Sequence, residues 1–266
     1  GGGARFDLDG VDAAGAFFAT MSDCGDVEVT EEDRPFLYLF RNFFDTSYGH
    51  GRFRGGAGVG VGLLVHGSKM LALGAMGAGA RFPTTLGTFG GYAVPPTFVQ
   101  YVHGSNMKKL LAEGSRRPTS LEDIYSAANS ESGQRHYHDV NMTVRPFGEG
   151  DTYYVAVGGG GGYGDPIERD PAAVVRDLRV GLVTPWAAEH VYCVVTDPQS
   201  FRLDVEATTR RRDEVRKERL RKARPFAEFA REWSKQSPPA SILRYFGTYP
   251  DPAEGLRPAL PKTVNM

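Results

Sequence analysis

The chain has 266 residues, of which 41% are hydrophobic and 24% are charged, and its formal net charge is −1. That length is sufficient for a substantial core, in one large domain or two small ones. The near-neutral charge gives no reason to expect nucleic acid or an acidic membrane surface as a partner. No apolar run reaches the roughly 18 residues of a transmembrane helix, and we expect no signal peptide.

The cysteine and glycine contents of the chain give further information about the class of protein. Two cysteines, Cys24 and Cys193, make no disulfide framework, so a reducing cytoplasm is the simplest expectation. Acidic neighbours of Cys24 argue against a reactive thiolate there. Glycine accounts for 34 of the 266 residues, about twice its average share. Because the chain starts at Gly1 without a methionine, we expect a processed product or a fragment of a longer polypeptide.

The first two-thirds of the chain are expected to be rich in strands. Residues 1–35 read as irregular, and aromatic or β-branched runs then predict strands at 36–44, 59–67, 69–82 and 97–104. A turn at residues 66–69 joins the second and third of these strands. Glycine-rich loops are expected at 46–58 and 86–96, short helices at 106–114 and 120–129, and a hairpin at 136–159 that turns at 148–150.

The last third is expected to be helical. Asp170 with Pro171 and Thr184 with Pro185 are helix-start signals, and they predict helices at 170–181 and 184–191. A short strand is expected at 192–197. Residues 207–235 predict one long helix, or two separated at Pro225. The fold class is therefore α+β, and we expect a strand-rich region 1–169, a helical region 170–236 and an extended, proline-containing tail 237–266, all within one domain of a larger assembly.

Five consecutive glycines, residues 158–162, follow a predicted strand and precede a helix. Successive backbone N–H groups can wrap a phosphate, and Gly159, Gly161 and Gly164 meet the bare Gly-x-Gly-x-x-Gly pattern. A glycine run meets that pattern trivially, and Asp165-Pro166 separates it from the helix. Close packing against another backbone, or positive φ, is therefore the favoured interpretation. The third alternative is a loop that lines a substrate channel.

Two motifs, in this order, resemble those of the hydantoinase B/5-oxoprolinase family: "GHGRFRGGAGV" at 49–59 and "GGGGGYGDPIERDP" with its two following helices from 158. Within that family, "FGGYAVPP" at 89–96 and the basic run at 210–225 are similar to the larger subunit of acetone and acetophenone carboxylases. The resemblance covers residues 10–235 and matches the C-terminal part of the family's usual chain.

The resemblance implies ATP-driven, biotin-independent chemistry in a multisubunit complex. In the carboxylase branch, an activated ketone enol is joined to a bicarbonate-derived carbon. In the hydrolase branch, ATP drives the opening of a cyclic amide such as a hydantoin, oxoproline or lactam. ATP and Mg are expected on a partner subunit of the hydantoinase A type. Metal ligands, where members have them, are expected on the N-terminal half, which this sequence lacks. A third alternative is an assembly module without catalytic groups.

Few side chains in the sequence are candidates for chemistry. His50, with Arg52 and Arg54, could meet an anionic group, because arginine forks fit carboxylates and phosphates; the alternative is a structural or solvated loop. His136 and His138 lie two residues apart on a predicted strand, but we expect them to contact neighbours rather than a metal. The glycine loops supply the remaining substrate-binding candidates: Gly90, Gly91, Tyr92, Gly160, Gly161 and Tyr163.

The basic run at 210–224 holds nine Arg/Lys residues and three acids. It lacks the interleaved aromatic residues typical of nucleic-acid binding, so we expect a solvated helix face or a docking strip for an acidic partner subunit. On that interpretation, reversal of the charges of Arg210, Arg211 and Arg212 would leave the chain folded.

Overall fold

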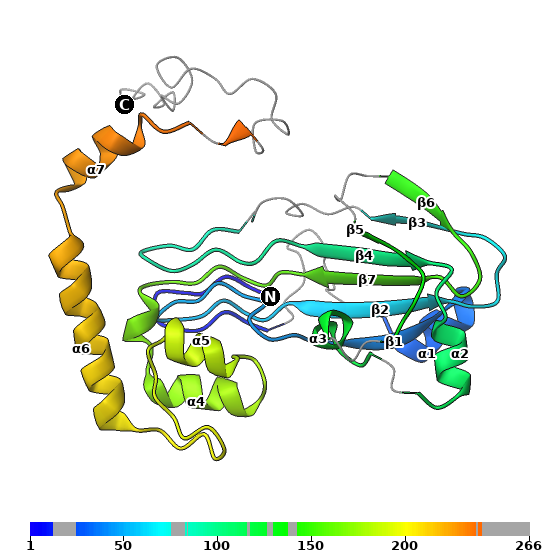
Figure 1. Ribbon diagram of the computed structural model, residues 1–266, viewed down its shortest axis with the longest axis horizontal. Coiled ribbons are helices and arrows are strands. Elements are labelled where there is room, and N and C mark those ends of the chain that lie inside the picture. The colour runs from blue at the N-terminus through cyan, green and yellow to red at the C-terminus, as the bar shows by residue number, and fades with distance from the viewer. Residues whose placement is uncertain are drawn as a thin grey trace, which may run out of the picture. The chain divides into compact units, whose positions relative to one another are not determined.

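The computed structural model describes residues 1–12, 25–75, 83, 85–115, 118–126, 130–137, 143–237 and 239–240. Its contacts divide the chain into two compact units, Gly1–Arg212 and Asp213–Met266. The first unit combines antiparallel sheets with helices, which confirms the α+β fold class (Figure 1). Among the described residues, no helix combines the length and hydrophobicity that a membrane span requires.

A five-stranded antiparallel sheet forms the centre of the first unit, with strand order β1-β2-β7-β4-β5. Strands β1, β2 and β4 lie where the sequence predicts strands. A separate ribbon pairs β3 with β6. The bounds of the strands are β1 Phe36–Phe43, β2 Val59–Val65, β3 Leu71–Ala75, β4 Phe98–His103, β5 Gln134–Tyr137, β6 Thr143–Phe147 and β7 Thr152–Val157.

Both faces of the sheet are covered. On one face, Leu64, Val102 and Tyr154 pack against helices α2 (Met107–Ala112) and α3 (Leu121–Tyr125). On the other face, Val65, Tyr101 and neighbouring side chains pack against the β3–β6 ribbon through Phe147. Because both faces are covered, buried residues follow one another along β4 and β7 instead of alternating with exposed ones.

Two strand pairings differ from the sequence-based prediction. β2 and β3 follow one another in the chain but belong to different sheets. The expected hairpin at 136–159 is also wrong, since β6 pairs with β3 and β7 lies between β2 and β4. The chain does turn at residues 148–151, but the two strands that flank the turn diverge. Turn residues locate a reversal of direction, and they do not decide which strands become partners.

Short helices begin where their capping residues predict. Ser120, Asp170 and Thr184 each accept a hydrogen bond from the first turn of α3, α4 (Pro171–Arg179) and α5 (Pro185–His190), respectively. Two expectations are wrong: residues 27–33 form a helix, α1 (Val27–Asp33), and the predicted strand at 192–197 makes only an isolated bridge between Thr196 and Leu203.

The charged C-terminal run forms two helices, α6 (Val205–Lys222) and α7 (Phe226–Trp233), which are separated at Pro225. Phe226, Phe229 and Trp233 line one side of α7, and all three are exposed. Most of the predicted extended tail, 238 and 241–266, lies outside the described residues, and so do residues 76–82 of the predicted third strand. The proposed division at residues 169 and 236 stays a prediction.

Candidate functional site

Four glycine-rich segments lie side by side beyond the end of the central sheet and form what we call the glycine layer: residues 1–12, 47–58, 85–95 and 158–164. Main-chain hydrogen bonds join the segments. Gly49 and Gly56 donate to the carbonyls of Gly160 and Gly2, and Gly162 donates to the carbonyl of Tyr92. Figure 1 shows the last three segments as extended chains that continue from β2, β4 and β7. The family-like loops at 49–59 and 158–164 are thus direct neighbours.

Close packing against other main-chain segments explains the five glycines of the run 158–162. A Cβ added at Gly160 would overlap the carbonyl of Gly2, and one added at Gly162 would overlap the carbonyl of His50. In both cases the nearest atoms are main-chain atoms closer than 3.0 Å, which cannot swing away as a flexible side chain would. Within the run 158–162, positive φ is not the reason, since the nearest positive φ is that of Gly164 at 74°.

The same contacts argue against a phosphate cradle in the run. Gly159, Gly160 and Gly162 donate their N–H groups to the carbonyls of Ser47, Gly56 and Tyr92. An anion site needs successive N–H groups that point toward the ligand, and these three already have main-chain partners. The described residues therefore do not fit a nucleotide phosphate at this loop.

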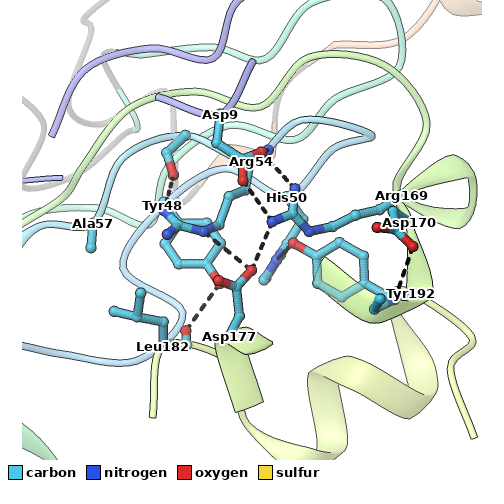
Figure 2. A network of polar contacts seen from close by, with 12 residues as sticks. Asp9, Tyr48, His50, Arg54, Ala57, Arg169, Asp170, Asp177, Leu182 and Tyr192 are labelled. Carbon is cyan, nitrogen blue, oxygen red and sulfur yellow. Dashed lines mark hydrogen bonds and ion pairs between the residues drawn. The ribbon is translucent and has the colours of Figure 1, made fainter. Parts of the chain in front are cut away.

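A buried ionic network lies between the glycine layer and helix α4 (Figure 2). Arg169, with 2% of its surface exposed, donates to both carboxylate oxygens of Asp9 at 2.6 and 2.7 Å and to Asp177 at 2.8 Å. Arg54 donates to both oxygens of Asp12, at 2.8 and 3.2 Å, and to Asp177 at 3.3 Å. Asp177 is therefore shared by the two arginines.

The network stabilises the charged form of its members. Burial alone would raise the pKa of Asp9, but the hydrogen bonds and charge of Arg169 outweigh it and hold that pKa below its usual value. Burial likewise works against the charge of Arg169, and its pKa is nevertheless raised by Asp9 and Asp177. Desolvation of such groups is costly unless hydrogen bonds compensate it, and here bidentate geometry supplies them.

His50 lies among aromatic side chains and is neutral. Its Nδ1 is 2.8 Å from the Tyr192 hydroxyl, and its ring meets those of Tyr48, Tyr92 and Tyr192 edge to face. Burial and then the charge of Arg169 lower the pKa of His50 to about 4. An uncharged imidazole favours the interpretation of His50 as part of a structural loop, and its contact with an anionic group stays a prediction.

Arg54 and Arg52, the two arginines of the loop, have different surroundings. Arg54 is buried within the ionic network, so the interpretation as a structural residue fits it. Arg52 is exposed, and it lines a depression of about 330 Å³ together with Arg176 and residues of the turn before α4. Of the candidates in this loop, Arg52 is therefore the one that a partner or ligand can reach.

The structure corrects the expectation that the basic run at 210–224 is a solvated face, because Arg212 is buried. It is 8% exposed, and its guanidinium donates to the carbonyls of Tyr192 and Arg169 at 3.1 and 2.8 Å. Because α6 has apolar residues at few positions, no pattern in the sequence separates this arginine from its exposed neighbour Arg210.

The remaining histidine candidates lie elsewhere. His136 is on β5, where its ring stacks on Tyr101 at a centroid distance of 5.0 Å and meets His103. His138 lies outside the described residues. Within the described part of the chain, no group of three or more His, Cys, Asp or Glu residues is arranged to hold a metal ion. That His136 and His138 are not a metal pair stays a prediction.

Sequence reasoning missed most of the ionic network, namely Asp9, Asp12, Arg169 and Asp177, and it also missed Tyr192, the hydrogen-bond partner of His50. One signal was available for Asp177. It lies in α4 at helical spacing from the buried Val174 and next to the buried Leu178, and a carboxylate on an apolar helix face needs a buried partner.

Comparison with known proteins supports the two sequence motifs. The chain is 34% identical, over 252 residues, to the acetophenone carboxylase delta subunit of Aromatoleum aromaticum, a match that covers 94% of this chain and 37% of that protein. It is 32% identical to the acetone carboxylase alpha subunit of Xanthobacter autotrophicus, over 86% of this chain and 30% of that protein, and 32% identical to the caprolactamase beta subunit of Pseudomonas jessenii, over 78% of this chain and 31% of that protein.

Solved structures of the same kinds of enzyme also match this chain. A nucleotide-free structure of acetone carboxylase matches with a TM-score of 0.75 and 30% identity, over 86% of this chain and 31% of that one. The ATP-dependent caprolactamase of Pseudomonas jessenii matches with a TM-score of 0.60 and 27% identity, over 80% of this chain and 32% of that one. The chain thus spans about a third of the length of its relatives.

The family model of hydantoinase B/oxoprolinase matches residues 1–166 of this chain, and these residues include all four segments of the glycine layer. The chain belongs to the hydantoinase B/oxoprolinase family.

Proposed function

We propose that this chain is a portion of the large subunit of an ATP-dependent, biotin-independent ketone carboxylase of the acetone/acetophenone type. The observation that carries the proposal is the match to the acetophenone carboxylase delta subunit, which extends over 94% of this chain. The corresponding match to the caprolactamase subunit covers 78%. The reaction would add a bicarbonate-derived carbon to the activated enol of a ketone, at the expense of ATP.

In this proposal the described residues form and position the site, and the reacting groups come from other parts of the enzyme complex. His50 is neutral and bonded to Tyr192, and Arg54 is engaged by Asp12 and Asp177. The amides of Gly159, Gly160 and Gly162 are engaged as well, so ATP and Mg are assigned to a hydantoinase A-type partner subunit. A divalent metal, if the enzyme uses one, is assigned to the N-terminal half of the family's chain.

A second candidate is a subunit of an ATP-dependent hydrolase of cyclic amides. It is supported by the caprolactamase of Pseudomonas jessenii, which shares both the sequence match and the fold, with a TM-score of 0.60. The third candidate, an assembly module, is favoured by the engaged state of the buried histidine and arginine. It differs from the first two because it requires no contact between this chain and substrate.

A chimeric subunit tests these candidates. In it, this chain replaces the matched region of the Aromatoleum delta subunit, and the chimera is assembled with the other subunits of that enzyme. ATP hydrolysis that needs both a ketone and bicarbonate supports the carboxylase. Hydrolysis that needs a lactam and is indifferent to bicarbonate supports the hydrolase and contradicts our first choice. The chain alone is expected to hydrolyse no ATP, and turnover by the isolated chain would overturn the assignment of ATP to a partner.

A further inference from the structure

The tip of the segment 85–95 is a tight turn with an unusual central residue. Gly91 donates to the carbonyl of Thr88 at 2.9 Å, and the two residues between them, Phe89 and Gly90, have φ values of 52° and 95°. Turns with positive φ at both central positions are dominated by glycine, asparagine and aspartate. A bulky aromatic residue at the first position is therefore strained.

Contacts within the described chain do little to hold Phe89 in this conformation. Its side chain is 82% exposed, and its ring meets that of Tyr163 at a centroid distance of 5.1 Å. Leu86 and Tyr92, on the same segment, are 72% and 47% exposed. Strain of this kind persists where the surroundings impose it and is concentrated at functional positions, and an aromatic residue with little intrachain packing is typical of an interface anchor.

The turn at Phe89 belongs to the same edge of the glycine layer as Arg52, the exposed arginine of the loop at 49–59. Tyr163 pairs with both Thr88 and Phe53, so three neighbouring segments meet at this edge of the layer. Arg52, which donates its N–H to Gly164, follows the same edge and borders the depression of about 330 Å³. Phe89 and Arg52 thus belong to one surface, which we call the layer edge.

Charges at the layer edge favour a polypeptide over a free oxyanion. Arg52 and Arg176 line the depression and have no carboxylate partner among the described residues. Three carboxylates, of Asp9, Glu168 and Asp170, line it as well. Asp9 is paired with Arg169, and the other two would repel a small anion. A mixed polar rim beside exposed aromatic side chains is the anatomy of a protein interface.

We propose that the layer edge receives the part of the large subunit that, in the relatives, lies outside the region matched by this chain, with Phe89 in an apolar pocket and a carboxylate against Arg52. The relatives supply the occupant, since this chain spans 37% and 31% of their lengths and so leaves most of each subunit without a counterpart here. The inference rests on the proposed function in one respect, namely that such a complementary polypeptide exists.

Binding can be measured without activity. The probe is the part of the Aromatoleum delta subunit outside the matched region, produced as a separate polypeptide, and the dissociation constant is measured for this chain and its variants. Phe89→Gly is expected to weaken binding at least tenfold, and to raise the urea midpoint of the chain alone because glycine relieves the positive-φ strain. Thr46→Gly, at another positive φ of 49°, is the control that relieves strain without affecting binding.

Arginine variants provide a second readout. Arg52→Met and Arg176→Met are expected to weaken binding several-fold and to reduce its dependence on salt, whereas Arg179→Met, an exposed position of α4 outside the depression, is expected to change neither. The same variants in the chimeric subunit are compared by protease protection of residues 85–95. Protection lost in Phe89→Gly and kept in Thr46→Gly supports the proposal independently of whether the separate probe folds.

Two outcomes of these binding and protection experiments would overturn the inference. Unchanged binding and unchanged protection in Phe89→Gly would show that the turn is only a strained loop. Self-association of the chain that depends on Phe89 would identify a second copy as the occupant. Failure of the proposed function is separable: a chimera without ketone-dependent ATP hydrolysis, in which Phe89 still controls binding, contradicts the function and not the layer edge.

Discussion

Replacement of Gly160 by alanine tests whether the glycine layer is held together by backbone contact. The new Cβ would overlap the carbonyl group of Gly2 and lie 2.6 Å from the nitrogen of Gly3. These are main-chain atoms, so the clash is relieved only if the segment 1–12 moves away from the run 158–162.

That movement has a cost that can be estimated from the structure. It breaks the hydrogen bonds from Gly56 to Gly2, from Gly10 to Arg54 and from Ala4 to Gly161. At about 1 kcal/mol net for each bond, the free energy of unfolding falls by about 3 kcal/mol. The cost is larger if Asp9 leaves Arg169, because an unpaired buried arginine is strongly destabilising.

The assay is equilibrium unfolding in urea, with Gly3→Ala as the matched control. Gly3 lies in the same segment, but a Cβ there has no atom within 4 Å, so its replacement is expected to be neutral or slightly stabilising. Limited proteolysis within residues 5–8 should accelerate in Gly160→Ala alone. Equal stability of the two variants, within about 0.5 kcal/mol, would refute the packing explanation.

Three further predictions concern the buried network. Arg169→Met should lower the free energy of unfolding by about 3–5 kcal/mol, because Asp177 loses its shorter ion pair; a urea midpoint close to that of the wild type would contradict this. His50 has a folded pKa of about 4, below its unfolded value, so the stability it confers is full above about pH 6.5 and is lost as the pH falls toward 4, by up to about 3 kcal/mol. His50→Gln should flatten the dependence of stability on pH in that window, and an unchanged profile would show that this histidine does not titrate as described. Arg212→Met should cost about 3 kcal/mol, because it leaves two buried carbonyls without their charged donor, and Arg210→Met should change little; equal effects in thermal melts would contradict the burial of Arg212.

Local signals predicted local structure well. The caps at Ser120, Asp170 and Thr184 and the break at Pro225 lie where expected, because each depends on the chemistry of a few adjacent residues. Strand partners were not predictable, since β7 lies between β2 and β4 for reasons of long-range packing. A helix was missed at Val27–Asp33, whose residues are all intermediate or exposed and so give no buried face to recognise.

The candidate site was predicted in outline and not in its contacts. The sequence singled out the two loops at 49–59 and 158–164, and the structure places them side by side. It could not show that Arg54 is neutralised within the chain while Arg52 is exposed, since the two lie two residues apart in one motif. That distinction depends on Asp12 and Asp177, which lie 42 and 123 residues away along the chain.

The glycine layer also has a consequence for the order of events during synthesis. Its first segment hydrogen-bonds to its last, as between Ala4 and Gly161, so the first segment cannot complete its contacts until more than half of the described chain has been made. Contacts between such distant residues slow folding, because a long loop must close before they contribute. Until then the N-terminal residues have only part of their partners, those of segment 47–58, and Arg169, which secures them through Asp9, is translated only after the whole layer. We therefore expect the amides of residues 1–12 to gain protection from hydrogen exchange last on refolding.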